Sequence, residues 1–128
     1  SATQNEINAE EAAMLIKNGV KVVAEAANMP CEQAAVEAFL DADVLFGPAK
    51  AVNAGGVGVS GLEMSQNSSR IAWDNEHLKT LLENMMKEIH DSCVKFGDTG
   101  GKNTNYLQGA NIAGFVKVAD AMIAYGHV

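Results

Sequence analysis

The chain has 128 residues, of which 48% are hydrophobic and 20% charged, and its formal net charge is −7 at pH 7. This length and composition are typical of one globular unit that can bury a core. The acidic balance excludes nucleic acid and anionic membranes as main partners, because binding to phosphates depends on clustered Lys and Arg. The sequence contains no apolar run of about 18 residues and no signal-like N-terminus, so we expect a cytoplasmic protein.

The chain begins with the pattern of a helix followed by a strand. Apolar side chains at helical spacing predict a helix from Ala9 to Asn18, and Gly19 is a residue type that commonly follows a helix end. The run VKVVAEAA, which starts at Val20, predicts a buried strand. The segment Asn28-Met-Pro30 ends this strand.

A second helix and strand follow. Pro30 suits the first turn of a helix predicted from Cys31 to Ala42, and a short strand is predicted from Val44 to Phe46. A strand, a helix and a strand within about 30 residues indicate a right-handed parallel unit. The segments after the two strands, Asn28 to Pro30 and Gly47 to Gly56, should therefore lie at one edge of the sheet. In open α/β sheets, ligands bind at that edge.

The remaining sequence is helical. Helices are predicted over residues 57–73, 75–96 and 105–125, and the Leu and Met stripe of the second is expected to pack in the core or between helices. Two strands and about five helices make a helix-rich α/β fold with too little sheet for a complete doubly wound domain. The chain is similar to the last third of such a domain. No linker or repeat divides residues 1–128 into two domains.

The cysteines and histidines give no sign of a reactive or metal site. Cys31 and Cys93 lie far apart inside helical patterns, so we expect reduced and unreactive thiols. The histidines His77, His90 and His127 share no ligand spacing with one another or with a cysteine. We therefore predict surface histidines and no bound metal.

The stretch NAGGVGVSGLE, from Asn53 to Glu63, places four glycines where a helix should begin. Residues Gly56 to Gly61 match GxGxxG, but that motif should directly follow the first strand of a unit. A GxSxG nucleophile motif would need glycine where Leu62 stands. Two interpretations remain open. Either the glycines let a ligand approach the backbone of a helix N-terminus, or the helix packs so closely that only glycine fits.

Four motifs occur together and in order: TQNE (3–6), ANMP (27–30), FGPAKAVNAGGVGVSGLEMSQN (46–67) and TNYLQGANIAGFVKVADAMIAYG (104–126). With these motifs, essentially the whole chain resembles the C-terminal part of the bacterial NADP-specific glutamate dehydrogenases. The resemblance implies part of a Rossmann-like dinucleotide-binding domain. It also implies reversible oxidative deamination of L-glutamate to 2-oxoglutarate and ammonium, with NADP as cofactor and a homohexameric full-length protein.

The resemblance implies roles for six residues. Asn53 matches an asparagine that contacts the nicotinamide end of the cofactor, and Asn28 matches one near the nicotinamide ribose. Gly55 and Gly56 then allow close approach to the backbone. An asparagine before a helix can also be its N-cap, so Asn53 can have both roles.

The two remaining residues concern the substrate. Ser60 matches a serine that hydrogen-bonds the distal carboxylate of the substrate, and Val57, one turn earlier, matches a residue that shapes the same pocket. The catalytic lysines and aspartate of the family lie upstream of the matched region, and Lys17, Lys21 and Lys50 do not match them. We expect this segment alone to be inactive.

Two other classes of protein remain as alternatives. The chain could be a non-catalytic nucleotide-binding or interaction module, or part of another amino-acid dehydrogenase. Ser60 opposes a leucine-type substrate, because a hydroxyl facing a methyl group is left unsatisfied. The choice of NADP over NAD rests on the resemblance alone. We also expect exposed strand edges and apolar surface to promote self-association of the isolated chain.

Overall fold

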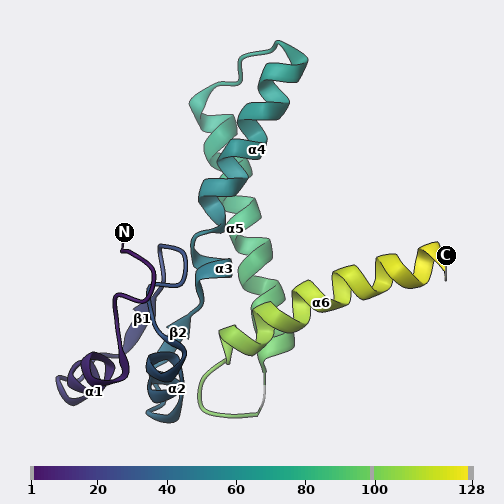
Figure 1. The fold of residues 1–128 in the computed structure, drawn as a ribbon. Coiled ribbons are helices and arrows are strands. Elements are labelled where there is room, and N and C mark those ends of the chain that lie inside the picture. Colours follow the sequence, from purple (N-terminus) through teal and green to yellow (C-terminus); the bar gives the residue numbers. More distant parts are fainter. Residues whose placement is uncertain (1, 99, 127–128) are drawn as a thin grey trace.

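The computed structural model describes residues 2–98 and 100–126 and shows a helix-rich α/β fold (Figure 1). The elements follow one another in the order α1 (Ala9–Lys17), β1 (Val22–Ala24), α2 (Gln33–Asp41), β2 (Leu45–Gly47), α3 (Ala49–Val52), α4 (Ala54–Ser69), α5 (Asn75–Gly97) and α6 (Tyr106–Tyr125). The five predicted helices and both predicted strands are present, and the four-residue helix α3 is additional. His127 lies outside the described residues.

Strands β1 and β2 form a two-stranded parallel sheet, as the strand–helix–strand pattern predicts. Val22 pairs with Leu45, and Ala24 pairs with Gly47. Helix α2 connects the two strands and packs on β2. Because the strands run in the same direction, the segments that follow them leave the sheet at one edge. This edge is where the sequence places the candidate site.

Strand β1 is shorter and more exposed than the sequence predicts. The predicted buried strand began at Val20, whereas β1 has three residues and its Val22 is 57% exposed. The physical reason is that β1 has little packed on it: in the described part of the chain it pairs only with β2, and the main helix contacts of the sheet are with β2. The second strand is shifted by one residue from the predicted range and ends at Gly47.

The predicted position of Pro30 in the first turn of a helix is wrong. Helix α2 begins at Gln33, and the residues before it pair with an N-terminal segment instead. The Ile7 N–H donates to the Pro30 carbonyl at 2.9 Å, and the Glu32 N–H donates to the Ile7 carbonyl at 2.9 Å. These bonds hold the chain in an extended bridge at Cys31, so the helix cannot start earlier.

Helix α1 has strong local signals at both ends. The Asn8 side chain accepts hydrogen bonds from the Glu10 and Glu11 N–H groups, and the Glu11 carboxylate accepts from the Asn8 N–H in a capping box. This arrangement satisfies N–H groups that have no partner inside the helix. Gly19 follows the C-terminus with φ +83°, a conformation that glycine adopts without steric cost.

The main hydrophobic core lies between α1, α2 and the sheet. At its centre, Phe39 of α2 stacks on Phe46 of β2 with ring centroids 6.2 Å apart. The buried members are Ala12, Cys31, Ala35, Val36, Phe39, Val44 and Phe46. This packing fixes β2 and thereby the starting position of α3.

The second half of the chain is a helical assembly. Helices α4 and α5 lie side by side as a hairpin that extends away from the sheet, and α6 crosses α5 near its C-terminal end (Figure 1). Helix α4 ends at Ser69, four residues before the predicted end, because Arg70 adopts a left-handed conformation with φ +56°. The predicted Leu and Met stripe of α5 faces these neighbours, and Cys93 is its buried member.

The glycine-rich helix begins earlier than predicted. The region 47–56, predicted as a loop, contains α3 and the first residues of α4, and α4 starts at Ala54 rather than Val57. Hydrogen bonds continue through the junction, where the Asn53 N–H donates to the Ala49 carbonyl at 2.9 Å and the Gly56 N–H to the Asn53 carbonyl at 3.2 Å. The glycines therefore lie inside a nearly continuous helical segment, and the Gly56 N–H already has a partner.

From Phe115 to its C-terminal end, α6 presents apolar side chains to solvent. Phe115 is 72% exposed, Met122 67% and Ile123 78%. Such a surface favours association, so self-association of the isolated chain stays a prediction, which size-exclusion chromatography over a concentration series would test. No helix within the described residues is long and apolar enough to cross a membrane.

Candidate functional site

Two asparagines meet at the edge of the sheet. Asn28 lies in the segment after β1, and Asn53 lies between α3 and α4, after β2. The Asn53 Nδ2 donates to the Asn28 Oδ1 at 2.6 Å. The parallel topology predicts that these two segments lie together, and the contact confirms it. The pair retains one amide oxygen and one amide nitrogen for other partners, so it can accept and donate at one place.

The contact changes the interpretation of Asn53 as an N-cap. Asn53 is the residue before α4, but its side chain makes no capping hydrogen bond. The side chain is turned toward Asn28, to which its Nδ2 donates, and its Oδ1 accepts no N–H of α4. Helix α3 ends at Val52, directly before Asn53, so α4 has no isolated N-terminus that would need such a cap. The alternative role of the Asn53 side chain as an N-cap, which the sequence left open, is therefore not seen.

The glycines of α4 differ in their surroundings: Gly56 is open, Gly58 is closely packed, and at Gly55 a Cβ would fit. A Cβ on Gly56 would meet nothing within 4 Å, so a ligand can approach the backbone there. A Cβ on Gly55 would lie 3.5 Å from the Met86 sulfur, and one on Gly58 would overlap the Met85 side chain. Gly55 and Gly58 therefore face α5, whereas Gly56 faces open space.

Val57 and Ser60 lie on the open side of α4. Val57 is 78% exposed, and Ser60 is exposed one turn further along. Positions 53, 57 and 60 are separated by four and three residues, so they form one stripe on the helix. With a rise of about 1.5 Å per residue, Ser60 is about 10 Å along the helix from Asn53. The Ser60 hydroxyl donates to the Gly56 carbonyl at 3.1 Å and would have to rotate to donate to a ligand.

Sequence reasoning missed one charged residue at this edge. Glu25 follows β1 directly and is only 6% exposed. Its Oε1 accepts from the Cys31 N–H at 3.2 Å, and its Oε2 accepts from the Ala49 N–H at 2.8 Å. The available signal was a glutamate inside the apolar run VKVVAEAA, since a carboxylate is rarely buried without partners.

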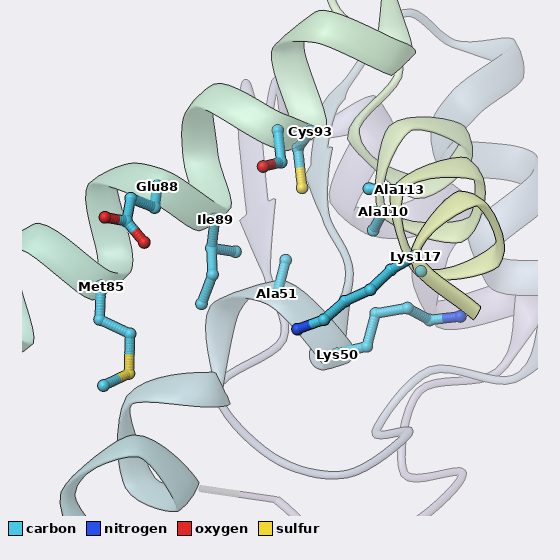
Figure 2. Close-up of a pocket in the computed structure, with 11 residues that line it drawn as sticks. Lys50, Ala51, Met85, Glu88, Ile89, Cys93, Ala110, Ala113 and Lys117 are labelled. Carbon is cyan, nitrogen blue, oxygen red and sulfur yellow. The ribbon is translucent and has the colours of Figure 1, made fainter. Parts of the chain in front are cut away.

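A separate hollow of about 460 Å³ lies between α3, α5 and α6 (Figure 2). Ala51, Ile89 and Cys93 contribute apolar surface, and Lys50 and Lys117 extend along it (Figure 2). The Lys50 ammonium donates to the Asn111 side chain and so links α3 to α6. None of the six predicted site residues lines this hollow. Figure 2 thus shows a feature distinct from the asparagine pair.

Both cysteines are buried free thiols, as predicted. Burial, together with the neighbouring Glu25 carboxylate, raises the pKa of the Cys31 thiol to about 12. Burial alone raises the pKa of the Cys93 thiol. Since the thiolate is the reactive form, both side chains are poor nucleophiles near neutral pH.

The raised pKa values predict how the thiols respond to pH. We expect neither cysteine of the folded chain to be alkylated at about pH 8, and both to react in urea, where a thiol pKa is about 8.5. Because the pKa of each thiol is higher in the folded than in the unfolded chain, the protonated thiol contributes to the free energy of unfolding. For Cys31 this contribution is complete below the unfolded-state pKa and is lost as the pH rises toward the folded-state pKa of about 12. Urea unfolding at increasing alkaline pH, with mass spectrometry of the alkylated protein, measures both effects. Rapid alkylation of the native chain would contradict them.

The histidines make local contacts only. His90 lies 3.2 Å from the Tyr106 hydroxyl through its Nδ1, and the His77 ring meets Trp73 edge-on. Both histidines are exposed, as predicted. Within residues 2–98 and 100–126, no three His, Cys, Asp or Glu side chains gather as metal ligands would.

The parallel sheet and the surrounding helices define a helix-rich α/β fold, and the paired amides lie at the strand ends, where ligands bind in open α/β sheets. Comparison with known proteins identifies the family. The chain belongs to the Glutamate/Leucine/Phenylalanine/Valine dehydrogenase family, which matches residues 1–126.

The individual relatives reported below are all named glutamate dehydrogenases. The chain is 58% identical over 98% of its length to the NADP-specific glutamate dehydrogenase of Salmonella typhi. It is equally similar to the NAD(P)-specific glutamate dehydrogenase of Xylanibacter ruminicola. Its fold matches the crystal structure of Plasmodium falciparum glutamate dehydrogenase with a TM-score of 0.91 and 41% identity, covering 99% of this chain and 27% of that one. The chain spans 28% of the length of the two bacterial relatives.

Proposed function

We propose that this chain is part of a glutamate dehydrogenase that interconverts L-glutamate with 2-oxoglutarate and ammonium. The observation that supports this most directly is the Asn28–Asn53 contact at the carboxyl edge of the parallel strands. Family membership and the glutamate dehydrogenases among its relatives supply the reaction. NADP is the proposed cofactor, since several relatives are named NADP-specific. NAD is the less favoured one, although one relative is named NAD(P)-specific and another NAD-specific.

The proposed roles follow from the chemistry of the open site. The asparagine pair retains an amide donor and an amide acceptor, which suit a carboxamide or ribose hydroxyl at the nicotinamide end of the cofactor. Gly56 leaves space beside the backbone, and Gly55 lies at the same turn on the side of α5, where an added Cβ would make an ordinary contact 3.5 Å from the Met86 sulfur. When bound, the nicotinamide would accept a hydride from the α-carbon of glutamate. The asparagine pair would orient the nicotinamide ring, and the open backbone at Gly56 would leave room for the cofactor beside it.

Ser60 and Val57 are proposed to face the substrate. The Ser60 hydroxyl would donate to the distal carboxylate, and Val57 would cover the adjoining methylene groups. The catalytic lysines and aspartate would come from outside residues 1–128, which we propose to be one partial cofactor-binding domain. We further propose a cytoplasmic homohexamer for the complete protein, with this segment forming one wall of the cleft.

Replacing Ser60 with alanine should weaken use of the dicarboxylate in the complete protein. A hydrogen bond to a charged group contributes about 1.5–3 kcal/mol, so the KM for 2-oxoglutarate should rise roughly 10- to 100-fold. The KM for NADPH should stay nearly unchanged. Steady-state kinetics with each substrate varied in turn measures both constants.

Ser65 provides a matched control on the same helix. Its hydroxyl donates to the Gly61 carbonyl at 2.9 Å, the same kind of internal bond that Ser60 makes, and it too is exposed. Five positions from Ser60, Ser65 points to another side of α4. Equal effects of Ser60→Ala and Ser65→Ala would show that Ser60 has no special role toward the substrate.

The proposed function itself is tested by cofactor absorbance. NADPH and NADH are supplied separately with 2-oxoglutarate and ammonium, to this chain and to a version extended upstream to its natural start. We expect the extended protein to turn over and the 128-residue chain to be inactive, because one wall cannot position both reactants. Failure of both with every 2-oxo acid tried would overturn the proposal.

A further inference from the structure

The buried carboxylate of Glu25 binds backbone N–H groups of the two segments that carry Asn28 and Asn53. The Glu25 N–H donates to the Gly47 carbonyl at 3.0 Å and extends the strand pairing by one residue. The carboxylate is therefore held between the ends of the two strands. With 6% exposure, it is the buried charged side chain among the described residues.

Each carboxylate oxygen binds a different segment. Oε1 accepts from Cys31, three residues after Asn28, and Oε2 accepts from Ala49, four residues before Asn53. These two segments are otherwise joined at this edge by the contact between the asparagine side chains. A single carboxylate thus binds the backbone near both asparagines, and on the Asn28 side it acts together with the N–H groups of Asn5 and Ile7, which donate to the Met29 and Pro30 carbonyls.

The bond to Ala49 is made at the first residue of α3. Pro48 occupies the N-cap position and has no side-chain acceptor, so Glu25 supplies from a distant strand what a Ser or Asp cap would supply locally. A hydrogen bond to an ionised acceptor is shorter and stronger than a neutral one. Together with the packing of β2, this bond holds the first residue of α3, and Asn53 follows one helical turn later.

We propose that Glu25 is a positioning residue that holds Asn28 and Asn53 in register to receive the nicotinamide end of the cofactor. The inference rests on the proposed function for the identity of the ligand. The claim that Glu25 holds the two asparagines in place does not depend on which ligand they bind. Two side chains can keep a mutual hydrogen bond only while their backbones stay at a suitable separation, and Glu25 restrains the backbone near both asparagines.

Two variants remove the restraint from opposite ends. Glu25→Gln keeps the side-chain shape but turns one acceptor into a donor that faces an N–H group. Ala49→Pro removes only the N–H that donates to Oε2. Proline is tolerated at a first helical position, and the preceding Pro48 already has the extended ψ of 150° that proline requires of its neighbour. Glu32→Gln, an exposed glutamate before α2, is the matched control for charge.

The first measurement is hydrogen exchange of the Asn53 side-chain amide, followed by NMR of the ¹⁵N-labelled chain. We expect exchange at least tenfold faster in Glu25→Gln and in Ala49→Pro, and no change in Glu32→Gln. This result needs no catalysis. Unchanged exchange in both variants would overturn the proposal.

The second measurement uses the extended protein. We expect the KM for NADPH to rise about tenfold in both variants, with the KM for 2-oxoglutarate within twofold of its original value. In an Asn53→Ala background, Glu25→Gln should add no further change, because it acts through Asn53. Equal changes in both constants would indicate a general structural role and overturn the proposal. If the unmodified extended protein does not turn over, the proposed function fails, and amide exchange alone decides the role of Glu25.

Discussion

Replacing Gly109 with alanine should destabilise the chain by about 3 kcal/mol or more. Gly109 is buried where α6 crosses α5. An added Cβ would overlap the Cys93 carbonyl oxygen and lie 2.8 Å from the Cys93 carbonyl carbon. These are backbone atoms of a helix and cannot rotate away, so the two helices would have to separate. Thermal unfolding followed by circular dichroism should show a midpoint lowered by roughly 10 °C.

Gly114 provides the control on the same helix. A Cβ there would meet nothing within 4 Å. Alanine is favoured over glycine inside a helix by about 1 kcal/mol, so Gly114→Ala should leave stability unchanged or raise it. A Gly109→Ala protein as stable as the original would mean that α5 and α6 are not in backbone contact. The hollow between α3, α5 and α6 would then have a different shape.

Replacing Phe39 with alanine should cost about 3–5 kcal/mol. The ring is 0% exposed and stacks on Phe46 at 6.2 Å and 18°. Its removal leaves a cavity beneath β2 and loses the aromatic pair. Because β2 leads directly into α3, the position of Asn53 should also become less defined. Urea unfolding gives the stability change, and hydrogen exchange of the Asn53 side-chain amide reports the local effect.

Phe115 is the matched control for Phe39. It is 72% exposed on α6, so Phe115→Ala should change the stability of the isolated chain by less than about 0.5 kcal/mol. A large loss at Phe115 would mean that the α6 surface is covered in solution, as self-association would cause. A small loss at Phe39 would contradict the position of the core between α1, α2 and the sheet.

The sequence alone predicted the parallel unit, the five longer helices and the shared edge that brings Asn28 and Asn53 together. These features depend on local signals. Apolar periodicity marks a helix or strand, and two parallel strands must send their following segments to the same edge. The contact at 2.6 Å between the two side chains is the detailed consequence. The family resemblance was also correct, since it rested on several motifs along the chain.

Only the tertiary structure decided how buried β1 is, where α4 begins and which glycines are open. Exposure depends on what lies beside a strand, and a helix start depends on distant hydrogen-bond partners. Glu25 shows this most clearly, because its two acceptors are used by Cys31 and Ala49, six and 24 positions away. The sequence determined which residues reach the edge of the sheet. Packing and long-range hydrogen bonds determined how they are held there, because such bonds join residues whose separation no local pattern encodes.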